Sequence, residues 1–273
     1  MTSQKASEKV NIVLCGASGQ MGRRLIQLIS SSPSLELTGA VEHKDCPFLG
    51  HDAGSLAGVA PLGVVLTDDF TQGAKGAQVY LDFSSPRGVG EHVLKAAQLS
   101  LAAVIGVTAL GTEVEEKLKE AAKKIALLYA PNMSFGMNLM YKIAAEVATL
   151  LGKDYNIEIV EAHHNRKKDA PSGTALMLYE KLKAARGITS DVKKLGRSNV
   201  PGPRTSEEIG IHAVRGGDIV GDHQVIYAGP GEVLEIVHRA QSRDAFVTGA
   251  LRACQWIIGK PPGLYNFSEV LGI

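Results

Sequence analysis

The chain has 273 residues, of which 45% are hydrophobic and 21% are charged, so a largely disordered protein is excluded. Its formal net charge of +1 at pH 7 gives no overall attraction to nucleic acid or to an anionic membrane. At this length we expect one large domain or two unequal domains. Glycine is frequent, with 30 residues, and aromatic residues amount to 5%, which favours an α/β fold over a β-sandwich.

The three cysteines, Cys15, Cys46 and Cys254, are widely spaced and include no C-x-x-C pair. This pattern argues against a disulfide framework and a cysteine zinc site, and we interpret each cysteine as a small buried hydrophobe. The first ten residues lack the apolar segment of a signal peptide, and no apolar run approaches the ~18 residues of a membrane span. We therefore expect a cytoplasmic protein without a metal, a membrane or a nucleic-acid partner.

Short apolar runs alternate with helical patterns over roughly the first 130 residues. Strands are predicted at Val10–Cys15, Leu35–Val41, Val64–Leu66, Val79–Phe83, Ala102–Ile105 and Ala126–Tyr129, and helices at Gln20–Ser30, Pro86–Leu99 and Thr112–Lys124. Thr112 is the predicted N-cap of the last helix, with Glu115 closing a capping box. This alternation is typical of βαβ units and predicts a parallel sheet.

After Pro131 the pattern changes. Helices are predicted at Phe135–Leu151 and Ser172–Arg186, a strand at Asn156–Ala162, a loop at Asp191–Glu208, and strands at Ile209–Arg215, Asp222–Ala228 and Glu232–His238. Short glycine-rich turns separate the last three strands, and such turns connect antiparallel neighbours. We therefore expect an antiparallel or mixed sheet with helices on it, followed by a closing helix at Ala245–Ile258 that returns to the first half.

The first glycine-rich motif, Gly16–Gly22, lies between the first strand and the first helix. Glycines at such a turn let the backbone approach a pyrophosphate, and the helix N-terminus supplies N–H groups and a positive dipole end. Because a tight turn alone uses the same residues, nucleotide binding depends on this strand–turn–helix context. Glu42, at the end of the second strand, is either a solvated carboxylate or an acceptor for ribose hydroxyls, and the loop favours the second role.

Two further segments follow strands of the predicted parallel sheet. Gly106–Thr108 comes after one strand and Ala130–Met133 after the next. Both are either ordinary loop turns or cofactor contacts, and their place at the carboxyl ends of strands favours the contacts.

The segment Glu161–Thr174 contains two histidines, several cations and a predicted helix start. Zinc is disfavoured, because adjacent histidines of a strand point to opposite faces and no further ligands follow at metal spacing. The segment is either a solvated basic loop or an anion site, in which cations and the N–H groups of Ser172–Thr174 bind a carboxylate while a histidine gives a proton. We interpret Arg215–Asp218 and Gly221–His223 as tight turns without a catalytic role.

Together, GASGQMG at Gly16–Gly22 and EAHHNRKKDAPSGTA at Glu161–Ala175 resemble the 4-hydroxy-tetrahydrodipicolinate reductase (dihydrodipicolinate reductase) family of bacterial lysine and diaminopimelate biosynthesis. The segment VRGGDIVGDH is similar to that family as well. The resemblance implies a Rossmann-type parallel-sheet nucleotide-binding domain, residues 1–133 completed by 243–273. It also implies a mixed α+β domain, residues 134–242, which binds substrate and forms a homotetramer through its sheet.

The same resemblance implies NADH- or NADPH-dependent reduction of a small cyclic imine dicarboxylate. The implied cofactor-binding residues are Gly16, Ala17, Ser18, Gly19, Gln20 and Met21 at the pyrophosphate, Glu42 and His43 at the ribose, and Gly106, Val107, Thr108, Ala130, Pro131, Asn132 and Met133 on the nicotinamide side. His163 is implied as proton donor or acceptor and Lys167 as a second donor. His164 is implied as a substrate contact, and Gly173 and Thr174 as a carboxylate clamp.

Some positions depart from the family pattern. His43 and Gln20 stand where arginine is frequent, and Ala109 ends a stretch that usually reads G-T-T-G. An imidazole is mostly neutral at pH 7, so we expect both cofactors to be used, with NADH at least as good as NADPH. Two other functions stay open, an amino-acid dehydrogenase and a nucleotide-sensing regulator without catalysis. The set His163, Lys167 and Thr174 argues against the regulator.

Overall fold

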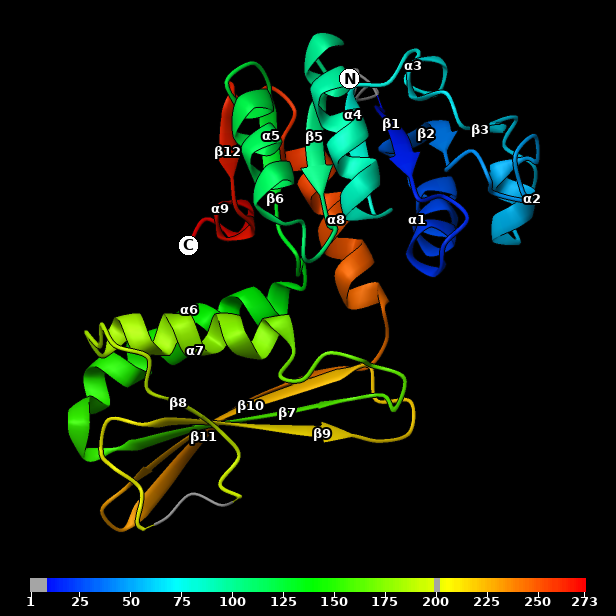
Figure 1. The fold of residues 1–273 in the computed structure, drawn as a ribbon. Helices are drawn as coiled ribbons and strands as arrows, with labels where there is room; N and C mark the ends of the chain where they lie inside the picture. Colours follow the sequence, from blue (N-terminus) through cyan, green and yellow to red (C-terminus); the bar gives the residue numbers. More distant parts are fainter. Residues whose placement is uncertain (1–8, 199–201) are drawn as a thin grey trace, which may run out of the picture. The chain divides into compact units, whose positions relative to one another are not determined.

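The structure, a computed structural model, describes residues 9–198 and 202–273. Residues 1–8, part of the segment examined for a signal peptide, lie outside the described residues. The chain divides into two compact units (Figure 1). The first runs to Met133 and is completed by Phe246–Ile273, and the second comprises Ser134–Ala245. Each unit has its own sheet and its own hydrophobic core.

The first unit is built on a seven-stranded parallel sheet. Its strands are β1 (Val10–Cys15), β2 (Leu35–Val41), β3 (Leu66–Thr67), β4 (Val79–Asp82), β5 (Ala102–Ile105), β6 (Ala126–Tyr129) and β12 (Gly263–Tyr265). They pair in the order β12-β6-β5-β4-β1-β2-β3. The strand order therefore reverses between β1 and β4, and open α/β sheets generally bind ligands beyond the carboxyl ends of the strands at such a point.

Helices cover both faces of this sheet (Figure 1). They are α1 (Gln20–Ser30), α2 (Ala53–Ala57), α3 (Phe70–Gly73), α4 (Pro86–Gln98), α5 (Thr112–Ala122), α8 (Asp244–Trp256) and α9 (Phe267–Leu271). Side chains of β1 alternate between two cores: Ile12 and Leu14 pack with α1 and α8, and Val13 and Cys15 pack with α4 and α5. A strand covered on both faces is apolar throughout, which explains the continuous run VNIVLC.

Most predicted elements of this unit are confirmed to within a few residues, but the capping prediction is wrong. Gly111, not Thr112, is the N-cap of α5, and no side chain caps the helix. Gly111 has φ of +79°, and its carbonyl accepts the Glu115 N–H at 3.0 Å, so the helix begins one residue earlier than a threonine cap requires. The third strand is also displaced, to Leu66–Thr67, and α2, α3, α9 and β12 were not predicted.

The second unit has a five-stranded mixed sheet with two long helices on one face (Figure 1). The strands are β7 (Asn156–His163), β8 (Lys193–Leu195), β9 (Ile209–Arg215), β10 (Gly221–Gly229) and β11 (Glu232–Ala240), and the helices are α6 (Phe135–Leu151) and α7 (Gly173–Ala185). A 3₁₀ turn at Gly152–Asp154 follows α6. The strand order is β11-β10-β7-β9-β8, so β7 lies at the centre.

Alternate residues of β7 and β10 build the core beneath α6 and α7. Ile157 and Ile159 of β7 and Val225 and Tyr227 of β10 are buried there. The Tyr227 hydroxyl also donates to the Ala144 carbonyl of α6 at 2.6 Å, so this large side chain is satisfied as well as packed. The buried side of β7 continues with Glu161 and His163 in place of apolar residues.

Two predictions about this sheet are wrong. β9 and β10 are not hairpin neighbours, because both pair with β7, β9 in parallel and β10 antiparallel. The Gly216 N–H donates to the His163 carbonyl at 3.0 Å, so the glycine turn crosses the end of β7. The predicted loop Asp191–Glu208 contains β8, and its residues 199–201 lie outside the described residues. The expected mixed sheet with helices on it is confirmed.

Candidate active site

The glycine loop after β1 is packed so closely that Gly16 and Gly22 have no room for a side chain. Gly16 has φ of +79°, and a Cβ there would lie 2.8 Å from the Phe83 carbonyl oxygen. A Cβ on Gly22 would lie 2.1 Å from the Gly16 carbonyl oxygen. Gly19 is the N-cap of α1 and contributes no side-chain cap. The N-terminus of α1 therefore follows a glycine turn and has no side-chain cap, an arrangement that suits phosphate groups.

Glu42 follows β2 and its carboxylate lies against the same loop. Its Oε1 accepts the Ser18 N–H at 2.8 Å and the Ser18 hydroxyl at 2.7 Å. Arg23, which the sequence analysis did not single out, donates from Nε to the Ser18 carbonyl at 2.8 Å, and its guanidinium lies 5.2 Å from the Phe48 ring centre. His43 is exposed beside Glu42. The structure thus brings the expected ribose-side residues next to the loop and adds a cation there.

The other expected cofactor segments follow β5 and β6 at the same edge of the sheet. The first N–H of Gly106–Thr108 donates to the Asp82 carbonyl at 2.9 Å, and a Cβ on Gly106 would lie 2.4 Å from the Phe83 ring. The first N–H of Ala130–Met133 donates to the Ile105 carbonyl at 3.1 Å. Phe83, missed from the sequence, therefore lies between the glycine loop and the segment after β5.

Asp82 ends β4 and is fully buried, and its hydrogen-bond partners within the described residues are all neutral groups. Burial raises the pKa of its carboxyl to about 6, although hydrogen bonds from Ser84 and Tyr80 oppose the rise. The Ser84 N–H and hydroxyl donate to its Oδ1 at 2.7 and 2.6 Å, and the Tyr80 hydroxyl donates to Oδ2. Asp82 thereby holds the turn that packs on Gly16. An acidic residue ending the apolar run VYLD was the signal in the sequence.

Two groups of side chains in the first unit place possible metal-binding atoms within 4.8 Å of one another. They are Cys15, Asp82 and His92, and Glu42, His43 and Cys46. In both groups the carboxylate is already hydrogen-bonded, to Tyr80 and Ser84 or to Ser18. Burial also raises the pKa of the Cys15 thiol far above its ordinary value, which disfavours the thiolate that binds metals. These hydrogen bonds and the raised thiol pKa disfavour metal binding at these groups.

In the second unit, titratable and charged side chains lie together at the end of β7. His163 is 9% exposed, and its Nδ1 lies 2.6 Å from Oε2 of the buried Glu161. Arg215, at the end of β9, donates from both terminal nitrogens to the two oxygens of Glu161 at 2.8 Å. The ring of His223 from β10 meets His163 edge-on, with 5.2 Å between centroids. Sequence reasoning placed Arg215 and His223 at the ends of predicted strands and interpreted the segments Arg215–Asp218 and Gly221–His223 as turns without a catalytic role, so it missed that both side chains lie next to the Glu161–His163 pair.

The loop from β7 to α7 adds cations and a helix N-terminus to the same place. Lys167 pairs with Asp169 at 2.9 Å, and burial with nearby cations lowers the pKa of His164. Ser172 is the N-cap of α7, as predicted, and accepts the Ala175 N–H at 3.1 Å. Thr174, in the first turn, is hydrogen-bonded through its side chain to Tyr141 of α6. The expected substrate-side residues His163, His164, Lys167, Gly173 and Thr174 are therefore together in this unit.

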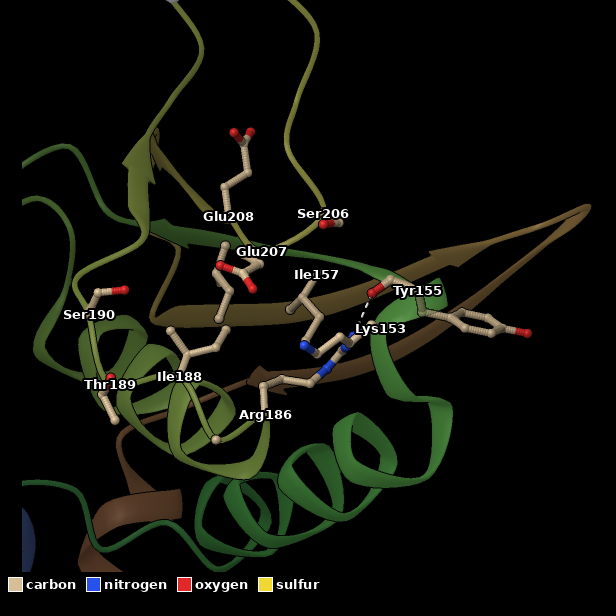
Figure 2. Close-up of a pocket in the computed structure, with 12 residues that line it drawn as sticks. Lys153, Tyr155, Ile157, Arg186, Ile188, Thr189, Ser190, Ser206, Glu207 and Glu208 are labelled. Carbon is tan, nitrogen blue, oxygen red and sulfur yellow. Dashed lines mark hydrogen bonds between the residues drawn. The ribbon is translucent and has the colours of Figure 1, made fainter.

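A separate cavity of about 200 Å³ lies at the opposite end of β7, where that strand begins (Figure 2). Lys153, Arg186 and Glu207 are among its lining side chains, and Arg186 donates to the Tyr155 carbonyl. Its lining mixes both signs of charge and includes none of the residues at the His163 end. We therefore keep this cavity separate from the candidate active site.

The fold and the two sites define a class of protein. A parallel sheet with a glycine loop, a helix N-terminus and a strand-end carboxylate is built for a dinucleotide. A buried histidine–carboxylate pair among cations contains the kinds of group that general acid–base catalysis on an anion uses. Together these features define a dinucleotide-dependent oxidoreductase of the Rossmann type.

The comparisons with known proteins specify the family. The family model described as dihydrodipicolinate reductase, N-terminus, matches residues 10–133, and the model of its C-terminus matches residues 136–271. The chain belongs to the dihydrodipicolinate reductase family.

Individual relatives agree over nearly the whole chain. The 4-hydroxy-tetrahydrodipicolinate reductase of Anaeromyxobacter dehalogenans is 43% identical and covers 96% of this chain and 97% of its own. That of Geobacter metallireducens is 44% identical over 97% and 99%. A solved dipicolinate-bound dihydrodipicolinate reductase from Paenisporosarcina sp. TG-14 is 25% identical, with a TM-score of 0.75 and coverage of 94% and 97%. Within the described residues, no helix has both the length and the apolar character needed to cross a bilayer.

Proposed function

We propose that this chain catalyses the NAD(P)H-dependent reduction of 4-hydroxy-tetrahydrodipicolinate to tetrahydrodipicolinate in diaminopimelate and lysine biosynthesis. The observation that carries the proposal is made at the end of β7 in a chain of this family. There the imidazole of His163 is hydrogen-bonded to Glu161, and the following loop contributes Lys167 and the N-terminus of α7. The relative from Paenisporosarcina is described as dipicolinate bound, and dipicolinate is itself a ring dicarboxylate. A doubly negative ring requires this kind of surrounding.

The first unit is proposed to bind NADH or NADPH. The Gly16–Met21 loop and the N-terminus of α1, which has no side-chain cap, suit the pyrophosphate, because a Cβ at Gly16 or Gly22 would collide with neighbouring backbone and open this tight turn. Glu42 would accept from the adenosine ribose in addition to Ser18. Gly106–Thr108 and Ala130–Met133 would line the nicotinamide, which supplies the hydride when bound.

The second unit is proposed to bind the substrate and to supply protons. Because Nδ1 of His163 faces Glu161, the Nε2 atom is the one that can hold or release a proton. Lys167 would be the second proton donor and balance the negative charge left after hydride addition. The N–H groups of Gly173 and Thr174 at the start of α7, together with His164, would bind a substrate carboxylate.

We further propose a homotetramer that forms through the sheet of the second unit, in the cytoplasm. The face of this sheet opposite α6 and α7 carries the exposed valines Val214, Val233 and Val237. β11 also leaves one edge of the sheet unpaired within the described residues. An apolar face beside a free edge suits contact with another copy of the chain.

The proposed reaction is tested by coupling the protein to the synthase that precedes it and following NADH or NADPH oxidation at 340 nm. Oxidation that depends on both the synthase and its substrates is expected. Turnover of NAD⁺ with amino acids, without the synthase product, would favour the amino-acid dehydrogenase alternative. Tight NADH binding without turnover of either kind would favour the nucleotide-sensing regulator.

A further inference from the structure

Glu161 is a buried carboxylate that continues the apolar side of β7. It follows Ile157 and Ile159 on the helix-covered side of β7 and is fully buried. A buried charge is costly unless it is paired and hydrogen-bonded. Its oxygens accept from His163 Nδ1 at 2.6 Å, from the Ser172 N–H at 3.0 Å and from two nitrogens of Arg215. Each of these hydrogen-bond partners is therefore a donor to the carboxylate.

Arg215 connects this carboxylate with the loop that carries Lys167. It stands opposite His163 in the β7–β9 register, and its Nη2 also donates to the Asp169 carbonyl at 2.7 Å. Burial alone would raise the pKa of Glu161, but hydrogen bonds from His163, Arg215 and Ser172 outweigh burial and lower it to about 2. The hydrogen bond to Glu161 raises the pKa of Arg215 in turn. The pair is therefore ionised near neutral pH.

The other ring nitrogen of His163, Nε2, lies beside Gly221 of β10, which has no side chain. A Cβ on Gly221 of β10 would lie 3.2 Å from His163 Nε2, closer than Cβ contacts usually are. Within residues 9–198 and 202–273, no hydrogen bond engages this Nε2. The titratable and charged groups around the ring are Glu161 of β7, Arg215 of β9, His223 of β10, and His164 and Lys167 of the following loop.

We propose that Glu161 and Arg215 are positioning residues that set the tautomer and the charge balance of His163. Glu161 fixes the Nδ1–H form, so that Nε2 exchanges the proton with the substrate. Arg215 cancels the charge of Glu161, so that the imidazolium formed at Nε2 can still release its proton. This inference rests on the proposed function, in which His163 is the proton donor.

Two single substitutions shift the balance in opposite directions. Glu161→Gln leaves Arg215 uncompensated beside His163, so protonation of the ring becomes harder and the pH dependence of kcat should move to lower pH. Arg215→Met leaves the carboxylate uncompensated, so the dependence should move to higher pH. Each shift should be about one pH unit or more, because a charge within ~4–6 Å acts at this scale. The double variant should return close to the wild-type profile.

Two further variants serve as controls. Arg215→Lys keeps the charge but loses the two-nitrogen contact, so it should lower kcat without moving the profile. Arg87→Met removes an exposed cation from an ordinary surface ion pair in the first unit and should change neither property. If Arg215→Met fails to fold, the opposed pair becomes Glu161→Gln, which shifts, against Arg215→Lys, which does not.

A second readout separates this inference from the proposed reaction. With ¹³Cε1-labelled histidine, the titration midpoint of the His163 resonance should move in the same directions as the kcat profile, and His163→Gln assigns the signal. If turnover persists while neither the resonance nor the profile of Glu161→Gln moves, the positioning role is overturned and the proposed function stands. If the resonance moves but the profile does not, His163 is not the proton donor and the inference fails with that role.

Discussion

Two buried carboxylates have opposite electrostatic surroundings in this protein. Asp82 has hydroxyl and N–H donors but no cation, and burial raises its pKa to about 6. Glu161 has Arg215 as well, and its donors outweigh burial and lower its pKa to about 2. The difference follows from the donors, because His163 and the Arg215 guanidinium both stabilise the ionised Glu161, whereas Asp82 accepts only from neutral groups. The first carboxylate lies at the proposed cofactor site and the second at the proposed proton-transfer site.

Asp82→Asn should change how stability depends on pH. A carboxyl whose folded pKa is raised stabilises the fold below its unfolded pKa, and this stabilisation is lost as pH rises through about 6. The variant lacks this loss. The Tm of the variant relative to wild type should therefore rise by several degrees between pH 4.5 and 7.5, as measured by calorimetry. The exposed Asp68→Asn serves as the control, and a difference that does not vary with pH would contradict the assignment.

Lys167→Ala should lower kcat by about 10²–10⁴-fold, the usual effect of losing a general acid. NADH affinity should stay nearly unchanged, because Lys167 belongs to the second unit and the glycine loop to the first. Steady-state kinetics and fluorescence titration with NADH measure the two properties. Lys168→Ala is the matched control from the same loop and should have a much smaller effect on kcat. A Lys167→Ala enzyme with near wild-type kcat would remove the proposed role.

His43→Arg should shift cofactor preference toward NADPH by about tenfold in kcat/KM, roughly 1.4 kcal/mol. Glu42 suits a ribose hydroxyl but repels a 2′-phosphate, and an arginine beside it would be a permanently charged partner for that phosphate. The measurement is kcat/KM for both cofactors at pH 7.5, where we expect wild type to use NADH at least as well as NADPH. A wild-type preference for NADPH above tenfold would indicate that another cation, such as Lys44 or Arg23, already binds the phosphate.

At the scale of elements, periodicity was informative where an element was long and one-sided. The strands around the glycine loop were predictable as short continuous apolar runs, and the helices α1 and α4 because their apolar residues recur with the helical period. β8 was not predictable, because an edge strand of three residues, two of them lysines, has the pattern of a loop. The helices α2 and α3 are shorter than two turns, so no period could reveal them.

The chain order of the strands did not predict which strands are neighbours. β9 and β10 are close in sequence yet flank β7, and only this arrangement brings Arg215 to Glu161, 54 residues away. The sequence supplied His163, Lys167 and the N-cap Ser172 because they share one local motif. It could not supply Arg215, His223 or Phe83, whose partners come from other strands.

At the scale of the whole molecule, the proposed tetramer has a direct consequence in solution. The chain has a mass of 28.9 kDa, so light scattering should give about four times this value, independent of concentration in the micromolar range. Val233→Lys together with Val237→Lys would place charges on the open face of the sheet and should reduce the mass. A concentration-independent mass near that of one chain for wild type would contradict the proposal.

The most direct test of the proposed reaction follows the hydride from NADH to the product. NADH carrying two deuterium atoms at C4 of the nicotinamide is supplied with the synthase product, and the reaction product is examined by mass spectrometry. We expect tetrahydrodipicolinate with one deuterium per molecule, formed in proportion to the NADH oxidised. NADH oxidation without deuterium in this product, or a product formed without NADH oxidation, would contradict it.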